Sequence, residues 1–400
     1  MSFLLAQVPA AVANPVPAAW RVITKMAYFA GLIGTIGATM LHLLVLRPVL
    51  KRRSVDPADR AVLHRRTSLL LAVIGTWFLV ALYFQIAGKA ARVKGVEIPY
   101  SQALRPGTIA KYVSVPAKRG EWVSSGALTL TQYLLWGASA VVLMLLWSPK
   151  LRAHLTGIAL SGLVLNFVAY QVTLLPTDFG KETVDSLVDS LLDHLHVFAV
   201  STWVGGIASL VVLATARRRL TPGAGTTWAG IWTRFSTVAL CAVGCLLISG
   251  LYLAWSLVGS PGELLTTSFG RFLLVKVCLV ATMIGIGALN EFVLMPRIGR
   301  ARAAGAEGSV FRLALRVFPG FVTAEVVLAV GVLFVLSFLT GSARVEAGDP
   351  DPTLSGGIVG IGVLLAVLLA ISFVTTAKLS ERLSRPAAAP APEPVPSAEF

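Results

Sequence analysis

The sequence predicts an all-α fold: a polytopic transmembrane helix bundle of about nine spans. Of its 400 residues, 56% are hydrophobic and only 13% are charged, whereas soluble proteins carry about a quarter charged residues. The apolar residues gather in stretches of the roughly 20 residues that a helix needs to cross a bilayer core about 30 Å thick. Each stretch is too long for a strand, and a lipid bilayer admits only helices and closed barrels.

The predicted spans are 26–47, 67–87, 127–148, 154–175, 192–214, 234–258, 272–295, 320–340 and 355–377. Small residues in the first span, Gly31, Gly34, Gly37 and Ala38, would let neighbouring helices approach closely.

Four regions follow from the order of these spans. Residues 1–175 form an N-terminal four-helix membrane region with an external loop at 88–126, and residues 176–340 form a core membrane domain. The segment 341–385 carries the final transmembrane helix. The tail 386–400 is rich in Pro and Ala, cannot build a core and is expected to be disordered in the cytoplasm.

The distribution of Lys and Arg predicts the orientation. With the N-terminus outside, the inward connections hold 21 of these residues and the outward ones 12. Seven of the 12 lie in the long loop 88–126, and long loops count for less in the positive-inside rule. The sequence therefore predicts an outer N-terminus and a cytoplasmic C-terminus in the cytoplasmic membrane. The net charge of +15 is explained in the same way, which disfavours nucleic acid as a partner.

Several function classes lack their motifs. The chain has no phosphate-binding Walker A loop, no His-Glu-x-x-His and no Cys-x-x-Cys. The three cysteines, Cys241, Cys245 and Cys278, fall within apolar segments and give no disulfide framework. No large soluble domain is present to hydrolyse ATP. We expect no intrinsic catalysis.

The run from Asp193 to Gly206 places possible metal ligands at the start of an apolar span. At 100° per residue, Asp189, Asp193 and His196 share one helix face, whereas His194 points some 160° away from His196. Either the helix begins near Val197 and the turn before it converges on one ion, or only one histidine belongs to a site. The structural alternative is that the aspartates complement the dipole at a helix N-terminus.

A second group of candidate ligands is predicted near the inner face, if the helices concerned are neighbours. It combines soft sulfur, imidazole and carboxylate at one depth: Met40, His42, Asn290, Glu291, Met295, Glu325, Cys241 and Cys245. An intramembrane glutamate such as Glu325 is costly unless it faces a partner or water. An ion pair with Arg234 or Arg316 is the structural alternative. Lys276 lies close enough to the outer surface for its ammonium to reach it.

Residues 190–340 resemble the copper-resistance CopD family of inner-membrane proteins. The resemblance rests on His194–Gly206, Arg234-Phe235-Ser236, Ser249-Gly250-Leu251-Tyr252, Val258-Gly259-Ser260, Phe269-Gly270-Arg271, Lys276, Ala288-Leu289-Asn290, Pro296-Arg297, Arg316 and Glu325. It implies copper handling at the cytoplasmic membrane beside an extracytoplasmic CopC-type copper-binding protein. It also implies histidine near the outer end of the core helix, which His194 and His196 match. Methionine-rich motifs, typical of many Cu(I) carriers, are absent.

We therefore expect a copper transport protein, with the copper ion as its substrate rather than a resident cofactor. His196, His194, Asp193 and Asp189 would bind copper on the outer side, and the inner group would line its exit. One alternative is a haem-binding electron-transfer protein, which needs two axial histidines on facing helices; His42 and His154 could pair if the first and fourth helices touch. Another is a non-transporting membrane partner of a copper chaperone.

Overall fold

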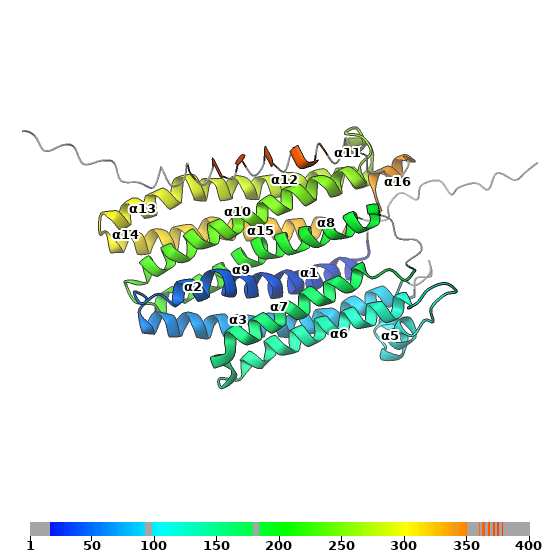
Figure 1. Ribbon diagram of the computed structural model, residues 1–400, viewed down its shortest axis with the longest axis horizontal. Coiled ribbons are helices and arrows are strands. Elements are labelled where there is room, and N and C mark those ends of the chain that lie inside the picture. The colour runs from blue at the N-terminus through cyan, green and yellow to red at the C-terminus, as the bar shows by residue number, and fades with distance from the viewer. Residues whose placement is uncertain are drawn as a thin grey trace, which may run out of the picture.

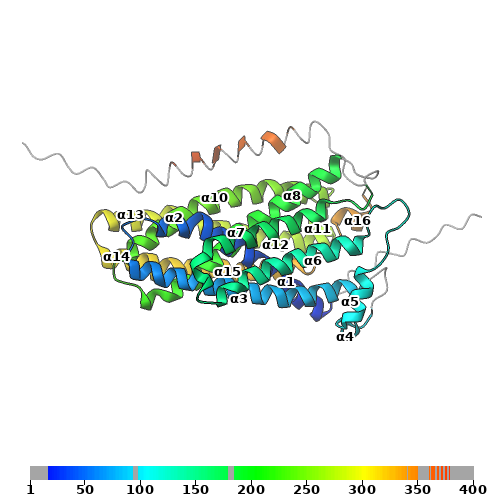
Figure 2. The same cartoon turned by 60° about the horizontal axis from the view of Figure 1, so that its bottom comes forward.

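The computed structural model describes residues 17–92, 98–178, 184–339 and 341–349, with isolated helical positions between 360 and 378. These residues form a helix bundle without strands (Figures 1 and 2), which confirms the predicted all-α class. Within the described residues, eight helical segments are long and apolar enough to cross a membrane, so the chain is a multi-pass membrane protein. The predicted ninth span, 355–377, and the predicted tail, 386–400, lie outside the described residues apart from those isolated positions.

The first four membrane-length segments run along the N-terminal half of the chain. They consist of α1 (Ala19–Met40) with η1 (Leu41–Leu46) and α2 (Arg47–Leu50); α3 (Pro57–Ala90); α6 (Ser125–Met144) with η3 (Leu145–Trp147); and η4 (Leu151–His154) with α7 (Leu155–Gln171) and η5 (Val172–Leu174).

The other four follow in order. They consist of α8 (Val184–Val200) with η7 (Ser201–Gly205), α9 (Gly206–Ala214) and η8 (Thr215–Arg219); α10 (Ala224–Leu257); α12 (Ser268–Leu289) with η9 (Asn290–Leu294) and α13 (Met295–Ala303); and α14 (Glu307–Arg312) with η10 (Leu313–Val317) and α15 (Phe318–Leu336).

Several helices extend beyond the predicted apolar windows. The second was predicted over 67–87, but α3 begins at Pro57, where Asp56 caps it by accepting a hydrogen bond from the Ala58 N–H over 2.7 Å. Pro at the first helical position and Asp just before it are strong start signals. Hydropathy detects only the part of a helix that is apolar enough for lipid, so the polar first turns were missed.

Four of the helices contain a π-helical segment, namely η1, η7, η9 and η10. Such widened turns are rare and occur frequently at functional sites. Three of the predicted inner residues lie on them: His42 on η1, and Asn290 and Glu291 on η9.

The first and fifth membrane helices cross at two glycines. A Cβ atom at Gly37 would collide with the Ser201 carbonyl, and one at Gly205 would collide with the Ile33 carbonyl. Only glycine allows this backbone approach, as predicted for Gly37. Because α1 also packs along α3, it joins the early helices to the later ones.

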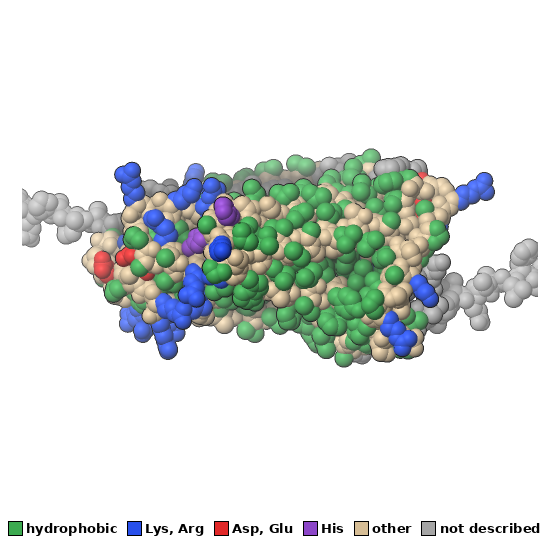
Figure 3. All heavy atoms as spheres, turned by 90° about the horizontal axis from the view of Figure 1, so that it is seen from below, with side chains coloured by type: hydrophobic (Ala, Val, Ile, Leu, Met, Phe, Trp, Pro, Cys, Tyr) green, Lys and Arg blue, Asp and Glu red, His purple; other side chains and the backbone are tan. Residues whose placement is uncertain are grey.

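The interior and the surface of the bundle differ as expected for lipid. Trp228 and Trp232 are fully buried in the largest apolar cluster, and the Trp232 indole N–H donates to the Ala314 carbonyl over 2.9 Å. Large apolar side chains such as Leu134, Leu251 and Val327 remain exposed. On the face drawn in Figure 3, apolar side chains form a broad band, with Lys and Arg gathered towards the two ends.

The external loop packs against one end of the bundle. It contains the short helices α4 (Tyr100–Ala103) and α5 (Pro106–Val113). The Tyr100 ring stacks on Trp20 at 4.3 Å between centroids, and the Trp122 indole donates to the Pro176 carbonyl over 2.7 Å. The described part of the loop therefore forms a small cap on this end of the bundle.

Candidate functional site

The helix that carries both candidate histidines is continuous. Because α8 runs from Val184 to Val200, the turn before Val197 is helical and does not converge on one ion. His194 and His196 consequently face different helices. This leaves the second sequence alternative, in which at most one of them contributes to a given site.

His194 is engaged with backbone carbonyls. It is buried, with Nε2 2.8 Å from the Tyr170 carbonyl oxygen and Nδ1 2.5 Å from that of Ser190. The Tyr170 ring also packs edge-on against the imidazole at 4.3 Å. A metal ion at either nitrogen would have to displace a carbonyl, so this histidine acts foremost as a link between α8 and α7.

The two aspartates lie exposed on the same helix as the histidines. Asp193 accepts a hydrogen bond from the Tyr170 hydroxyl over 3.1 Å, which places it beside His194. Asp189 lies next to the Tyr252 hydroxyl of α10. Both carboxylates sit at the end of the bundle where α8 begins, and they give this end a negative rim.

His196 has a different environment. Its Nδ1 lies 3.2 Å from the Ser249 Oγ, and the Ser249 hydroxyl in turn donates to the Cys245 carbonyl over 2.7 Å. Since the serine proton is used for Cys245, its oxygen accepts from Nδ1–H of the imidazole. This assignment leaves the lone pair on Nε2, which has no hydrogen-bond partner in the described part of the chain. A neighbouring hydrogen bond at one nitrogen is the usual way to select the metal-binding nitrogen of a histidine.

An apolar cavity of about 310 Å³ adjoins His196. Its walls come from α8 with η7, from α10, α12 and α15, and from Ile33 of α1. Besides His196, the lining includes the ammonium group of Lys276 and the thioether sulfur of the buried Met283. Imidazole nitrogen and thioether sulfur in one apolar cavity are donors that suit a soft metal ion.

Lys276 also lines this cavity. It is close enough to interact electrostatically with both His196 and Asp193. An ammonium in this position disfavours a cation at His196, and the Asp193 carboxylate offsets part of that effect.

The inner candidates are divided among separate contacts rather than gathered. His42 Nε2 lies 3.2 Å from the Thr156 Oγ1, the Asn290 amide donates to Glu325 over 3.0 Å, and the Ser236 hydroxyl donates to Glu291. Met40 packs against an aromatic cluster, while Met295 packs against the largest apolar cluster.

The hydrogen-bond partners of the inner group differ from the predicted ion pair of Glu325 with Arg234 or Arg316. Glu325 is paired with Asn290, and Arg234 donates to the Leu44 carbonyl instead. The cysteines Cys241 and Cys245 are free thiols. Across the described residues, no three His, Cys, Asp or Glu side chains lie close enough together to hold a metal ion.

The histidine pair that a haem would need is not formed by His42 and His154. Helices α1 and α7 do touch, but His42 contacts Thr156, and His154 is exposed at the start of α7.

Sequence reasoning missed the role of Ser249 beside His196 and that of Met283 in the cavity lining. Ser249 is a small residue within an apolar span, and Met283 is one of only six scattered methionines. Neither stands out in composition. Ser249 was named only as part of the motif Ser249-Gly250-Leu251-Tyr252 that carries the CopD resemblance, without a role of its own.

Acidic residues in the connections near the start of α8 and α12 accept hydrogen bonds from backbone N–H groups. The Gly259 N–H donates to Glu263 over 2.9 Å, which is the main reason that the pKa of this carboxyl is lowered from its usual value. Glu346, on α16 (Ala343–Ala347), accepts from the Ser268 and Phe269 N–H groups at the start of α12. These carboxylates therefore cap a loop and a helix.

Comparison with known proteins identifies related sequences for part of the chain. Residues 229–339 match the family model described as copper resistance protein D, CopD. A segment of 128 residues is 37% identical to the copper transport protein CutJ of Bacillus subtilis (strain 168), covering 32% of this chain and 23% of that protein. The chain thus matches about a quarter of the length of this relative. No solved structure matches.

The matched family segment begins in α10 and ends after α15, so it includes Ser249, Lys276 and Met283 but not His196. The cavity is therefore built jointly by the family segment and by the fifth membrane helix. The predicted resemblance to the CopD family is confirmed over residues 229–339, which match the family model.

Proposed function

We propose that the protein transports copper ions across the membrane, with His196 as the first ligand inside the bundle. The observation that carries the proposal is the free Nε2 of His196 beside an apolar cavity whose other walls belong to the CopD segment. The name of the Bacillus subtilis relative supports copper as the ion. An unpartnered imidazole nitrogen inside a membrane protein is a costly feature unless a ligand uses it.

The donor set favours the reduced ion. Copper(I) accepts low coordination numbers with soft sulfur and imidazole ligands, and the cavity offers one of each in His196 and Met283. The apolar walls offer no further oxygen ligands of the kind that a divalent ion prefers. Copper would therefore enter the cavity as Cu(I).

The acidic rim beside the cavity supplies the outer step. Asp189 and Asp193, together with His194, would raise the local concentration of cations before transfer to His196. An extracytoplasmic CopC-type protein would deliver copper to this rim.

The exit would use the polar residues deeper in the bundle. Glu325 lies one helical turn from Ala329 of the cavity wall, and its partner Asn290 is on a π-helical segment. Glu291, His42 and Met40 complete the proposed exit path. Local widening at η9 would let these side chains exchange partners as an ion passes.

Copper flux into proteoliposomes that contain the purified protein tests the proposal. We expect uptake by the original protein, and a loss of at least tenfold for His196→Ala, because no other imidazole lines the cavity. His154→Ala is the matched control, since His154 is exposed and far along the chain from the cavity; its flux should be unchanged.

Two results would contradict the proposal. Equal flux through His196→Ala and the original protein would remove the histidine from the path. Absence of flux in the original protein, with copper still bound, would favour a membrane partner of a copper chaperone, and a Soret band in the purified protein would favour a haem protein.

A further inference from the structure

A second cavity, of about 500 Å³, lies at the opposite end of the bundle from the His196 rim. It is enclosed by the connection between α2 and α3, by residues 221–223, by the first turns of α10, and by α13. Unlike the His196 cavity, its lining is mainly polar. Nothing in the copper proposal uses it.

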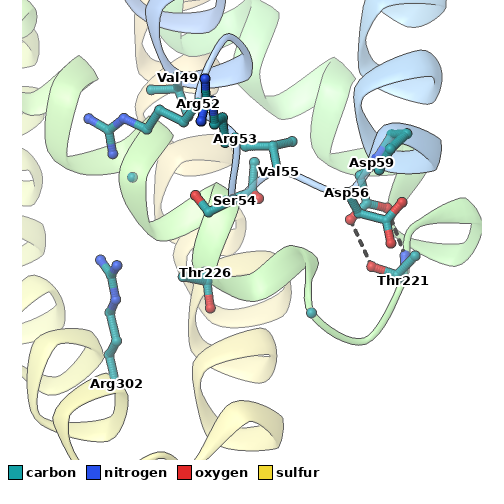
Figure 4. A pocket seen from close by; sticks show the side chains of 14 residues that line it. Val49, Arg52, Arg53, Ser54, Val55, Asp56, Asp59, Thr221, Thr226 and Arg302 are labelled. Carbon is teal, nitrogen blue, oxygen red and sulfur yellow. Dashed lines mark hydrogen bonds between the residues drawn. The ribbon is translucent and has the colours of Figure 1, made fainter.

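Three guanidinium groups line this cavity. Arg52 and Arg53 come from the connection after α2, and Arg302 extends from α13 into the space below them (Figure 4). These arginines are about 250 residues apart in sequence, so the fold gathers them. In the described part of the chain no carboxylate forms an ion pair with any of the three.

The two acidic residues of the lining are already engaged. Asp56 caps α3 through the Ala58 N–H, and Asp59 accepts two hydrogen bonds from Thr221, one from the N–H and one from the hydroxyl, both of 2.8 Å. Figure 4 shows both carboxylates on the side away from Arg302. Their role is to fasten α3 to the connection before α10, which leaves the arginines to face the open space.

Neutral donors and a helix end add to this positive field. Ser54, Thr226 and Thr227 contribute hydroxyl groups to the lining. The helix α10 is 34 residues long and begins at this cavity without a side-chain cap at Gly223. The partial positive charge of such a helix N-terminus favours an anion.

We infer that this arginine cavity binds a phosphate-bearing anion. Arginine forks match phosphate oxygens in a bidentate manner, and hydroxyl donors complete such sites. Basic pockets between membrane helices accommodate anionic lipid headgroups, and a free phosphate offers the same chemistry. The volume admits a headgroup as well as a single phosphate. The inference does not depend on copper transport.

Binding to the purified full-length protein in a neutral detergent tests the inference with two probes. One is inorganic phosphate, and the other is a short-chain phosphatidylglycerol, with short-chain phosphatidylcholine as the neutral comparison. We expect the original protein to bind at least one anionic probe tenfold more tightly than phosphatidylcholine. Displacement of phosphatidylglycerol by inorganic phosphate identifies the phosphate group as the shared determinant, and binding of phosphatidylglycerol alone identifies a lipid headgroup.

Substitutions separate this site from general surface charge. We expect the double variant Arg52→Gln/Arg302→Gln to bind the anion at least tenfold more weakly. The matched control, Arg217→Gln/Arg312→Gln, removes equal charge from residues outside the cavity lining and should bind as the original protein does. Thr226→Glu, at an exposed position of the lining, should also lose binding because it adds a carboxylate.

The inference is overturned if neither anionic probe binds more tightly than phosphatidylcholine. It is equally overturned if the double variant and its control bind alike while both elute as folded protein in size-exclusion chromatography.

Discussion

Two sets of polar side chains inside the bundle differ in whether their polar atoms have partners. His196 keeps one ring nitrogen free beside an apolar cavity, and the buried His42 likewise has a ring nitrogen, Nδ1, without a partner among the described residues. Deeper in the bundle, Asn290 and Glu325 satisfy each other, as do Ser236 and Glu291. A polar group that faces open space is poised to bind, whereas one with a partner mainly stabilises helix packing. The comparison teaches that position in the membrane alone does not identify a ligand.

The largest effect is expected at the serine that orients His196. Ser249→Ala removes the oxygen that accepts from Nδ1–H, so the ring loses its fixed tautomer and orientation. Loss of such a supporting hydrogen bond typically costs about 10- to 100-fold in metal affinity. Titration of the purified protein with Cu(I) against a competing chelator measures this. Ser256→Ala, which removes a hydroxyl from the same helix away from the cavity lining, is the control.

A copper affinity of Ser249→Ala equal to that of the control would show that Ser249 does not position the ligand. His196 would then differ from the Asn290–Glu325 pair only in facing a cavity.

The second effect concerns the inner pair and is one of stability. Asn290→Ala leaves the buried Glu325 without its donor, at an expected cost of about 1–2 kcal/mol in the free energy of unfolding. Glu325→Gln keeps an oxygen to accept from Asn290 and should cost less. Unfolding in mixed detergent micelles measures both variants, and copper affinity should stay within about threefold.

If Asn290→Ala instead weakened copper binding as much as Ser249→Ala, the inner pair would belong to the binding site itself. Binding by His196 and helix packing by Asn290 and Glu325 could then no longer be separated.

The third substitution is expected to raise the copper affinity instead of lowering it. Lys276→Gln removes a positive charge that lies near His196 and repels an incoming cation. A charge at about 10 Å in a medium of effective dielectric constant about 20 changes affinity roughly tenfold, so copper should bind more tightly to this variant. Arg271→Gln, one and a half turns away along α12 and outside the cavity lining, is the control. Weaker copper binding by Lys276→Gln would contradict the assigned role.

The sequence predicted the helical class and the positions of eight membrane helices because hydropathy and length decide both. It could not predict their ends, since polar first turns such as the one that Asp56 caps resemble loop residues in composition. The π-helical segments left no signal either. They depend on how a helix packs, as at the Gly37 and Gly205 crossing, and not on its own residues.

The candidate site was predictable only in part. Helical geometry alone indicated that His194 and His196 face different ways, and the continuous helix α8 agrees with this. That His194 would be held by the Tyr170 carbonyl, and that Ser249 would leave Nε2 of His196 free, required knowledge of which helices are neighbours. The inner group was proposed as one cluster because its members share a depth, but depth does not determine which side of each helix they occupy.

X-ray absorption at the copper edge, on protein loaded with one equivalent of Cu(I), tests the central claim most directly. Imidazole scattering should appear in the original protein and in His194→Ala, and it should vanish in His196→Ala. The opposite result, with imidazole scattering kept in His196→Ala and lost in His194→Ala, would contradict the assignment of His196 as the copper ligand.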